Sequence, residues 1–419
     1  MQNEKELVFP QGFYWGSATS AHQVEGMNAN SDWWAWEQEE IKKTLPKIKD
    51  LSAKACDHYD LFAEDFDWVK NLGQNAHRLS IEWARLEPEP GKWSQEVVGH
   101  YRDVFAALRE RKIEPFVAAM HFTLPRWLAD KGGWLNPDAP LYFKNYVNFL
   151  IENFGDQIKY WVTMNEPLIL AEMSYRRGVW APGKVRSWVD AFFALRNMAR
   201  AHKLAYRAMK DRSAQMAKEV EVGIVHNLIA ILPADKNSIF DVLLAKIMSF
   251  FVVDLYLKFF NGHEDFYGVN YYFEQRVHFD IHKPQNMFKG VDSKDEKRSD
   301  MGWTIRPEGL YQVLVKMKKF SKPIYITENG IADSQDKFRA QFIIEHLKEV
   351  HRAITQGVNV RGYFYWSLMD NFEWADGFAP RFGLLAIDYS DLSRTARKSA
   401  MIYQQICSSN RIPNSMNVL

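Results

Sequence analysis

Short apolar runs recur along this 419-residue chain, and longer stretches with helical spacing lie between them. Tyr101, Val104, Phe105 and Leu108, for example, follow the i, i+3, i+4, i+7 pattern of a helix with one buried face. Continuous apolar runs of this length are typical of strands buried on both faces. The predicted strands are Phe13–Thr19, Asn75–Ile81, Pro115–Met120, Tyr160–Met164, Val222–Val225, Phe266–Tyr271, Ile324–Thr327 and Gly362–Trp366.

Eight strands that alternate with helices predict a parallel sheet, and eight such strands can close into a (β/α)8 TIM barrel. The structural alternative, an open doubly wound sheet, usually carries a glycine-rich phosphate loop after an early strand. Neither G-x-G-x-x-G nor G-x-x-x-x-G-K occurs here. Length alone would permit two or three domains. Since no linker or low-complexity tract marks a boundary, we expect residues 1–419 to form a single barrel domain.

The barrel predicts where polar residues should stand, because its active sites lie at the carboxyl ends of the strands. Polar or aromatic side chains do follow the apolar runs or lie near their ends, with Arg78 within the second run and Trp366 as the last residue of the eighth, although Asn227 after the fifth run fits less clearly. These side chains are Gln23, Arg78, His121, Asn165, Glu166, Asn270, Tyr272, Glu328 and Trp366.

The segment from Ile239 to Phe260 is strongly apolar and therefore has to be tested as a membrane span. Four charged residues interrupt it, so no uncharged run reaches the roughly 18 residues that a spanning helix needs. We expect one or two amphipathic helices packed on the domain.

Composition narrows the classes of partner. The formal net charge is +1 and no lysine or arginine tract stands out, which argues against nucleic acid and membrane partners. The two cysteines, Cys56 and Cys407, form neither a disulfide framework nor a zinc-site spacing. Residues 1–6 lack a basic region followed by an apolar core, which predicts a cytoplasmic protein. Aromatic residues are 15% of the chain, and some of the 15 tryptophans could line a sugar site.

Two glutamates, Glu166 and Glu328, each close an apolar run and stand in a polar cluster. The first follows Thr163-Met164-Asn165 and precedes Pro167, and the second lies between Thr327 and Asn329-Gly330. Two carboxylates presented at strand ends suit a paired acid and nucleophile, which is what cleavage of a glycosidic bond by a covalent route requires.

The chain resembles the β-glycosidases of glycoside hydrolase family 1, and the resemblance runs over nearly its whole length. Any one of the shared strings is weak evidence, but their joint order is highly specific. They are Phe9-Pro10-Gln11-Gly12-Phe13-Tyr14-Trp15-Gly16, Ala18 to Gly26, Arg78-Leu79-Ser80-Ile81-Glu82-Trp83, Thr163 to Pro167, Ile326 to Gly330, Trp366 to Trp374 and Phe382-Gly383-Leu384.

The resemblance implies that Glu166 is the general acid/base and that Glu328 is the nucleophile. It assigns Arg78, Asn270 and Tyr272 to the support of the ionised nucleophile. It also implies a set of residues that hold the non-reducing sugar, in which Asn165 binds the 2-hydroxyl, Gln23 and Glu373 share the 4-hydroxyl, and Trp366 forms a hydrophobic floor. The whole set is Gln23, His121, Asn165, Tyr272, Trp366, Glu373 and Trp374.

Two features depart from the family pattern. Phe122 stands where tryptophan is more frequent, so an indole N–H near the 3-hydroxyl is lost. The segment from about Ala230 to Gly262 is short, which predicts a more open aglycone side.

The implied function is hydrolysis of terminal β-D-glycosyl residues, from β-glucosides and also β-galactosides or β-fucosides, by double displacement. The expected partner is a small β-glycoside or oligosaccharide, and no metal or organic cofactor is implied. Alternatives remain. A 6-phospho-β-glycosidase would need cations where Glu373 and Trp374 stand, and a transglycosylase would use the same residues. A non-catalytic sugar-binding protein would typically have lost one of the carboxylates that this chain keeps.

Overall fold

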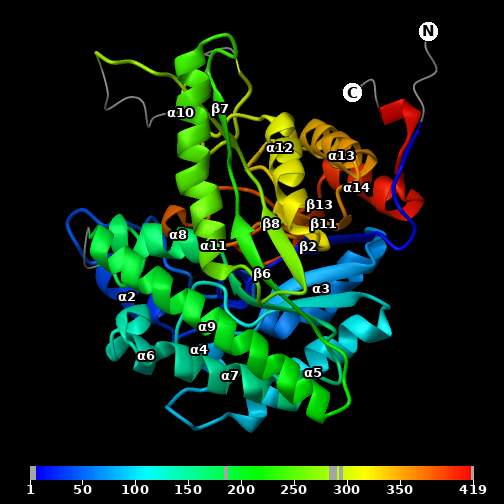
Figure 1. Ribbon diagram of the computed structural model, residues 1–419. Helices are drawn as coiled ribbons and strands as arrows, with labels where there is room; N and C mark the ends of the chain where they lie inside the picture. Colours follow the sequence, from blue (N-terminus) through cyan, green and yellow to red (C-terminus); the bar gives the residue numbers. More distant parts are fainter. Residues whose placement is uncertain (1–5, 184–186, 283–289, 292–295, 417–419) are drawn as a thin grey trace.

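The computed structural model of the chain describes residues 6–183, 187–282, 290–291 and 296–416 (Figure 1). Eight parallel strands close into a barrel in the order β10-β11-β2-β3-β4-β5-β6-β8. Each strand lies within two residues of a predicted one, so the prediction of a TIM barrel is confirmed. The barrel strands are β2 (Tyr14–Ala18), β3 (Ala76–Ser80), β4 (Glu114–Ala118), β5 (Tyr160–Asn165), β6 (Glu221–Asn227), β8 (Phe266–Asn270), β10 (Ile324–Asn329) and β11 (Val360–Trp366).

Amphipathic helices pack around the barrel. In α5 (Gln95–Glu110) the Ser94 hydroxyl caps the amino end by accepting from the Val97 N–H, and the predicted apolar face is buried. The longer helices are α2 (Asp32–Glu40), α3 (His58–Asn71), α5, α7 (Ala139–Phe154), α9 (Trp188–Gln215), α10 (Ile239–Ser249), α12 (Pro307–Met317), α13 (Arg339–Thr355) and α14 (Lys398–Ser409). Short helices are α1 (Ala21–Val24), α4 (Trp83–Leu86), α6 (Arg126–Asp130), α8 (Pro167–Leu170) and α11 (Tyr256–Phe260).

The barrel interior is filled with aromatic side chains. Phe116 and Tyr160 stack with their ring centroids 4.2 Å apart, and Tyr325 and Phe364 pack edge-on or tilted against Phe116. These residues belong to a buried cluster separate from the larger core between the strands and the helices. The barrel interior is therefore a packed core and not a pore. A substrate site has to lie at the ends of the strands.

Three smaller sheets lie outside the barrel. Strands β1 (Leu7–Val8) and β14 (Arg411–Ile412) pair antiparallel and join the two ends of the described chain. Strands β12 (Leu385–Ile387) and β13 (Arg394–Ala396) form a second antiparallel pair. Strands β7 (Ala230–Pro233) and β9 (Glu274–Val277) pair parallel, and in Figure 1 they rise with α10 as a projection at the top of the view.

The apolar segment 239–260 folds as α10, a π-helical turn η3 (Phe250–Leu255) and α11. Ala245, Met248, Val253 and Leu257 are buried, so one side packs as expected. The opposite side is exposed, which the sequence analysis did not anticipate. None of the helices in the described part of the chain is both long and apolar enough to cross a membrane.

Candidate active site

Buried polar side chains gather at the carboxyl ends of the barrel strands, as the barrel predicts. Arg78 comes from β3, Asn165 from β5, Asn270 from β8 and Glu328 from β10, and all four side chains are almost completely shielded from solvent. Burial of this many polar groups is costly unless they satisfy one another's hydrogen bonds. The site is therefore best described by the bonds among them.

Glu328 is held by a cation and a phenol. The Arg78 guanidinium donates to Oε1 and forms a buried ion pair, and the Tyr272 hydroxyl donates to Oε2 at 2.5 Å. Burial and the neighbouring Glu328 charge keep the pKa of Tyr272 well above its usual value, so the phenol remains a donor. Glu328 was expected just after its strand, but it lies within β10, which continues to Asn329. Both donors favour the ionised carboxylate.

Glu166 lies one residue beyond β5 and begins α8 with left-handed backbone dihedral angles, φ 43° and ψ 60°. A non-glycine residue in this region is strained, and such strain concentrates at functional sites. The side-chain amides of Asn270 and Asn227 donate to its Oε1 at 2.6 and 3.1 Å. Burial, and then the charge of Glu328, raise the pKa of Glu166 to about 8. The carboxyl is therefore mostly protonated at neutral pH.

The two carboxyl groups consequently differ in their neighbours, because Glu328 accepts from a cation and a phenol whereas Glu166 accepts from two amides. Arg78 donates to only one of the two carboxyl groups, that of Glu328. Its second N–H group donates to Asn165 Oδ1 at 2.7 Å rather than to Glu166. Asn165 Nδ2 in turn lies 3.2 Å from His121 Nε2. Burial and the Arg78 charge lower the pKa of His121 well below its usual value, so the imidazole is neutral. The amide oxygen of Asn165 is already occupied by Arg78, which orients its N–H group.

Asn270 takes a different place from the one expected. The sequence resemblance assigned it to the support of the nucleophile, whereas its amide donates to Glu166 and, at 3.2 Å, to Asn165 Oδ1. The Thr327 hydroxyl donates to Asn270 Oδ1 at 2.7 Å and thereby fixes the orientation of the amide. Asn270 thus acts on Glu166 directly.

Gln23 and Glu373 meet on the other side of the site. The Gln23 amide donates to Glu373 Oε2 at 3.4 Å and to the Phe372 carbonyl at 2.9 Å, and the Ser20 hydroxyl donates to Gln23 Oε1 at 2.6 Å. Burial first, and then the charges of Glu328, Asp376 and Glu166, raise the pKa of Glu373 to about 8. Glu373 is therefore mostly protonated at neutral pH, in a corner of the site where a further negative charge is unfavourable.

Aromatic rings border the same space. The Trp366 ring is nearly parallel to His121 at 6.1 Å between centroids, and the Trp374 ring is nearly parallel to it at 6.3 Å. Phe122 packs tilted against Trp180 at 4.9 Å and edge-on against Trp374 at 5.3 Å. Phe122 and Trp374 both have positive φ, 73° and 49°. The phenylalanine thus occupies its position as a packing residue without an N–H donor.

Asn227 is the functional side chain that the sequence analysis ranked too low. It is the last residue of β6, so the rule that site residues follow strands does apply to it. The predicted strand ended two residues early, which hid the agreement.

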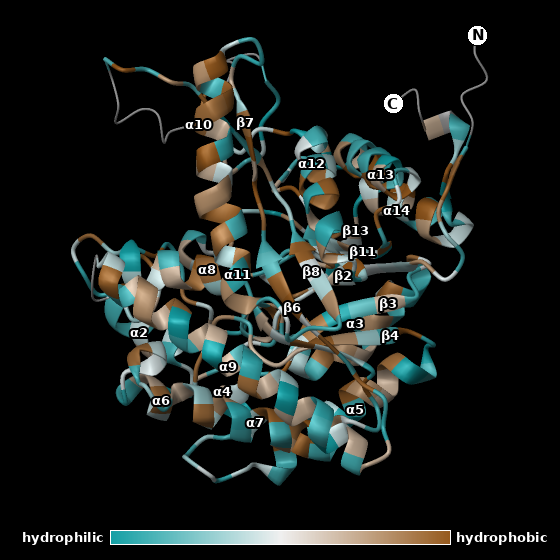
Figure 2. Cartoon of the chain, in the orientation of Figure 1, coloured by the Kyte–Doolittle hydropathy of each residue, from teal (hydrophilic) through white to brown (hydrophobic). Residues whose placement is uncertain are grey.

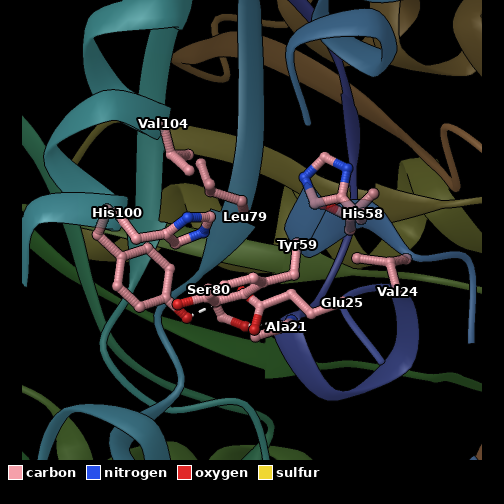
Figure 3. A pocket seen from close by; sticks show the side chains of 11 residues that line it. Ala21, Val24, Glu25, His58, Tyr59, Leu79, Ser80, His100 and Val104 are labelled. Atoms are coloured by element: carbon pink, nitrogen blue, oxygen red, sulfur yellow. Dashed lines mark hydrogen bonds between the residues drawn. The ribbon is translucent and has the colours of Figure 1, made fainter. Parts of the chain in front are cut away.

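A separate small cavity lies between β3 and helices α3 and α5 (Figure 3). Glu25, His58, Tyr59 and His100 point into it, and the Tyr101 hydroxyl donates to Glu25 at 2.8 Å. It has about 10 Å³ of room for the centre of a water molecule, enough for roughly one water. None of the sugar-binding residues expected from the sequence lines it, so it is not the substrate site.

In the described part of the chain, no group of three or more His, Cys, Asp or Glu side chains is arranged to hold a metal ion.

Comparison with known proteins gives one consistent result. The family model for glycosyl hydrolase family 1 matches residues 5–261 and 247–412. A 1,4-beta-D-glucan glucohydrolase from Thermotoga neapolitana is 34% identical, over 96% of this chain and 98% of its own, and a beta-galactosidase from Pyrococcus woesei is 32% identical over 97% and 98%. The solved beta-glycosidase from Pyrococcus horikoshii superposes with a TM-score of 0.89 at 38% identity, over 98% of this chain and 97% of its own. The beta-glucosidase from Thermotoga maritima in complex with glucoimidazole superposes with a TM-score of 0.87 at 33% identity, over 96% and 99%.

Proposed function

Because the chain belongs to glycosyl hydrolase family 1, we propose that it is a retaining β-glycosidase that removes terminal non-reducing β-D-glycosyl residues. β-Glucosides are the proposed main substrates, and β-galactosides or β-fucosides are also accepted. The observation that carries the proposal is the pair of buried glutamates with different hydrogen-bond partners at the strand ends. Glu166 has a pKa raised to about 8, whereas Glu328 is paired with Arg78 and Tyr272.

In the first step Glu328 attacks the anomeric carbon while Glu166 gives its proton to the departing glycosidic oxygen. The C–O bond to the aglycone breaks as the ester bond to Glu328 forms. Arg78 and Tyr272 donate to the Glu328 carboxylate and stabilise its charge. For this double displacement the two carboxyl groups should lie about 5–5.5 Å apart.

In the second step the direction of proton transfer at Glu166 reverses. Once Glu328 is esterified it carries no charge, so one of the two main causes of the raised Glu166 pKa disappears. The pKa of Glu166 then falls, and the carboxylate can take a proton from water. The water attacks the anomeric carbon from the face that the aglycone left, and Glu328 departs as a carboxylate.

The same set of residues proposed from the sequence would bind the glycone. Gln23 and Glu373 lie within hydrogen-bonding distance of each other, and one sugar hydroxyl could replace their long 3.4 Å contact. The oriented N–H group of Asn165 would bind the 2-hydroxyl, and this bond strengthens in the transition state. Trp366 would pack against the apolar face of the ring, with His121 and Trp374 beside it.

The proposal is tested with a panel of aryl β-glycosides, with proton NMR to follow the first-formed sugar anomer. We expect turnover, highest for the β-glucoside, and initial release of the β-anomer. Release of the α-anomer would contradict double displacement. Absence of turnover on the whole panel would favour a non-catalytic sugar-binding protein.

Activity should fall as the pH rises through about 8. Glu166 must be protonated for the first step, and its pKa is raised to about 8, so the proton is present below that pH and lost above it. The measurement is kcat/KM against pH for a β-glycoside with a poor leaving group, which should decline about tenfold per pH unit on the alkaline side.

Two variants identify the residue behind this alkaline decline. The Asn227 hydrogen bond lowers the pKa of Glu166, so Asn227→Ala should move the decline to higher pH. Glu373 also has a pKa of about 8, and Glu373→Gln should keep the decline at a reduced rate. If the alkaline decline disappears in Glu373→Gln, its cause is the pKa of Glu373 and not the pKa of Glu166.

Neutral sugars should be strongly preferred over 6-phosphosugars. The charges of Glu328 and Asp376, which help to raise the pKa of Glu373, would also repel a phosphate with about −1.5 to −2 charges. The expected ratio of kcat/KM for an aryl β-glucoside over its 6-phosphate is on the order of 10² or more, and Glu373→Ser should narrow it. A preference of the unmodified enzyme for the phosphorylated substrate would make it a phosphoglycosidase.

The chain is further proposed to be a single barrel domain. Strands from its two ends pair as β1 and β14, and the core between barrel and helices draws residues from Phe9 to Met416.

A further inference from the structure

Exposed apolar side chains are concentrated on two segments of the structure. Of the 21 large apolar side chains that are exposed in the described residues, 12 lie on the first turns of α9 or on the run α10–η3–α11. Figure 2 shows α10, the first part of this run, as a largely hydrophobic helix that stands away from the barrel, whereas α11 lies beside the barrel. We call these 12 residues the apolar face: Trp188, Val189, Phe192, Phe193, Ile239, Phe240, Leu243, Ile247, Phe250, Phe251, Val252 and Leu255.

The two segments form one surface. Phe192 on α9 and Phe259 on α11 pack with their ring centroids 6.2 Å apart, and the helices that carry them are in contact. The apolar face also contains every exposed Phe and Trp side chain among the described residues, including Trp188, which is 73% exposed, and Phe251, which is 60% exposed. Six aromatic side chains of this exposure present on the order of 600 Å². That already reaches the upper end of what monomeric proteins leave uncovered.

A basic groove continues the apolar face along α9. Arg196, Arg200, Lys203 and Arg207 follow one another at i, i+4, i+7 and i+11, on the helix ridge that begins with Trp188 and Phe192. Together with Phe259 and nearby apolar atoms they line a groove of about 420 Å³.

The cations of this groove lack carboxylate partners among the described residues. Arg200 donates to the carbonyl of Pro137 at 3.3 Å, and Arg207 lies 3.1 Å from His263 Nε2, but none of the four groove cations takes part in an ion pair. The chain as a whole has a net charge of only +1, so this positive surface is a local feature. Four unpaired cations beside an exposed apolar ridge match an anionic surface with an apolar interior.

We propose that the apolar face and the basic groove together bind the surface of an anionic phospholipid bilayer. The aromatic and aliphatic side chains enter the boundary between headgroups and acyl chains, and the groove cations bind lipid phosphates. The helices lie on the bilayer rather than crossing it. This departs from the expectation of no membrane partner, which rested on the absence of a lysine or arginine tract. Helical spacing disperses these four cations over 12 positions of sequence, so they form no tract.

A second copy of the chain is a less suitable occupant. In a two-fold symmetric contact the same surface appears on both sides, so the basic grooves of both copies would enter one interface. Like charges brought together without counterions oppose association, whereas lipid phosphates neutralise them.

The test is cosedimentation of the full chain with vesicles. Binding is expected to vesicles that contain phosphatidylglycerol, with much weaker binding to pure phosphatidylcholine, and to weaken as salt is added. Trp188 is the exposed tryptophan of the described residues, so bound protein should show a blue-shifted emission that Trp188→Phe largely removes.

Two variants separate the contributions. Arg196→Gln/Arg200→Gln/Arg207→Gln should lower the affinity for anionic vesicles about a hundredfold, at roughly fivefold for each cation. Phe192→Ser/Phe251→Ser should lower it at least tenfold, because two aromatic side chains no longer insert. Hydrolysis of a small aryl β-glucoside should remain unchanged in both, since none of these residues touches the candidate active site.

Control variants remove exposed cations and exposed apolar side chains elsewhere on the protein. Arg126→Gln/Arg361→Gln/Lys398→Gln removes three exposed cations, and Leu141→Ser/Met401→Ser removes two exposed apolar side chains. Both should bind like the unmodified protein. The proposal is overturned if no vesicle is bound, if neutral and anionic vesicles bind equally, or if the controls lose as much affinity as the variants. Light scattering that shows a dimer dissociated by Phe192→Ser/Phe251→Ser would assign the face to a second copy instead.

Discussion

Glu328→Ala is expected to lower kcat for all β-glycosides by on the order of 10⁵-fold or more, because the residue proposed to form the covalent intermediate is gone. The measurement is steady-state turnover of an activated aryl β-glucoside. A 2-fluoro aryl β-glucoside should in addition label Glu328 in the unmodified enzyme, since the fluorine slows breakdown of the ester more than its formation. Mass spectrometry of the digested protein locates the label, and a label on Glu166 or near-normal activity of the variant would refute the assignment.

A second variant, Glu328→Gln, distinguishes loss of the nucleophile from loss of the folded structure. Arg78 is completely buried, and removal of its carboxylate partner leaves an unpaired cation that costs about 3–5 kcal/mol. Glu328→Ala should therefore unfold at lower temperature. Glu328→Gln keeps the shape and an oxygen acceptor for Tyr272, but it cannot form the ester. Equal losses of activity in the two variants, with a smaller loss of stability in Glu328→Gln, would place the defect in the chemistry.

Glu166→Ala is expected to lower kcat/KM by about 10²–10⁴-fold for substrates with poor leaving groups, the range of general acid catalysis. Activated aryl glycosides need little protonation, so their first step should be affected far less. For them the second step becomes limiting, because no base activates water. Added azide needs no such base, and it should restore turnover and yield a β-glycosyl azide.

The comparison of substrates is the control for this prediction, because a damaged sugar site would slow all of them alike. The alkaline decline of activity should also disappear in Glu166→Ala when an activated substrate is used, since its cause is the pKa of Glu166. Equal losses on both kinds of substrate, without an azide product, would remove Glu166 from the acid/base role.

The sequence alone predicted the barrel and the positions of its site. Eight apolar runs marked the strands, because strands buried on both faces must be continuously apolar. The barrel rule then placed Arg78, His121, Asn165 and Glu166 near the strand ends, and the structure has them there. The apolar pattern and the barrel rule are enough for these positions, whereas the proposed roles of the residues came from the family resemblance.

Strand ends were less predictable, with consequences for single residues. The fifth and seventh strands each extend two residues beyond the predicted end, so Asn227 and Glu328 lie within strands rather than after them. Polar residues end an apolar pattern, but they do not end a strand when neighbouring strands still offer backbone hydrogen bonds. The strand ends predicted from the apolar pattern and those set by backbone pairing therefore differ where the site residues lie.

Only the tertiary structure decided which side chains contact one another and how their pKa values are shifted. Arg78 and Glu328 are 250 residues apart, and Asn270 donates to Glu166 although the family resemblance assigned it to the support of Glu328. The raised pKa of Glu166 is caused by burial and by a charge from another strand, and the apolar face exists because no other part of the described chain covers one side of α10. Hydrophobic periodicity states that one face of an element can be buried. Desolvation, charge pairing and exposure depend on the neighbours that distant segments provide, and these are set only when the barrel closes.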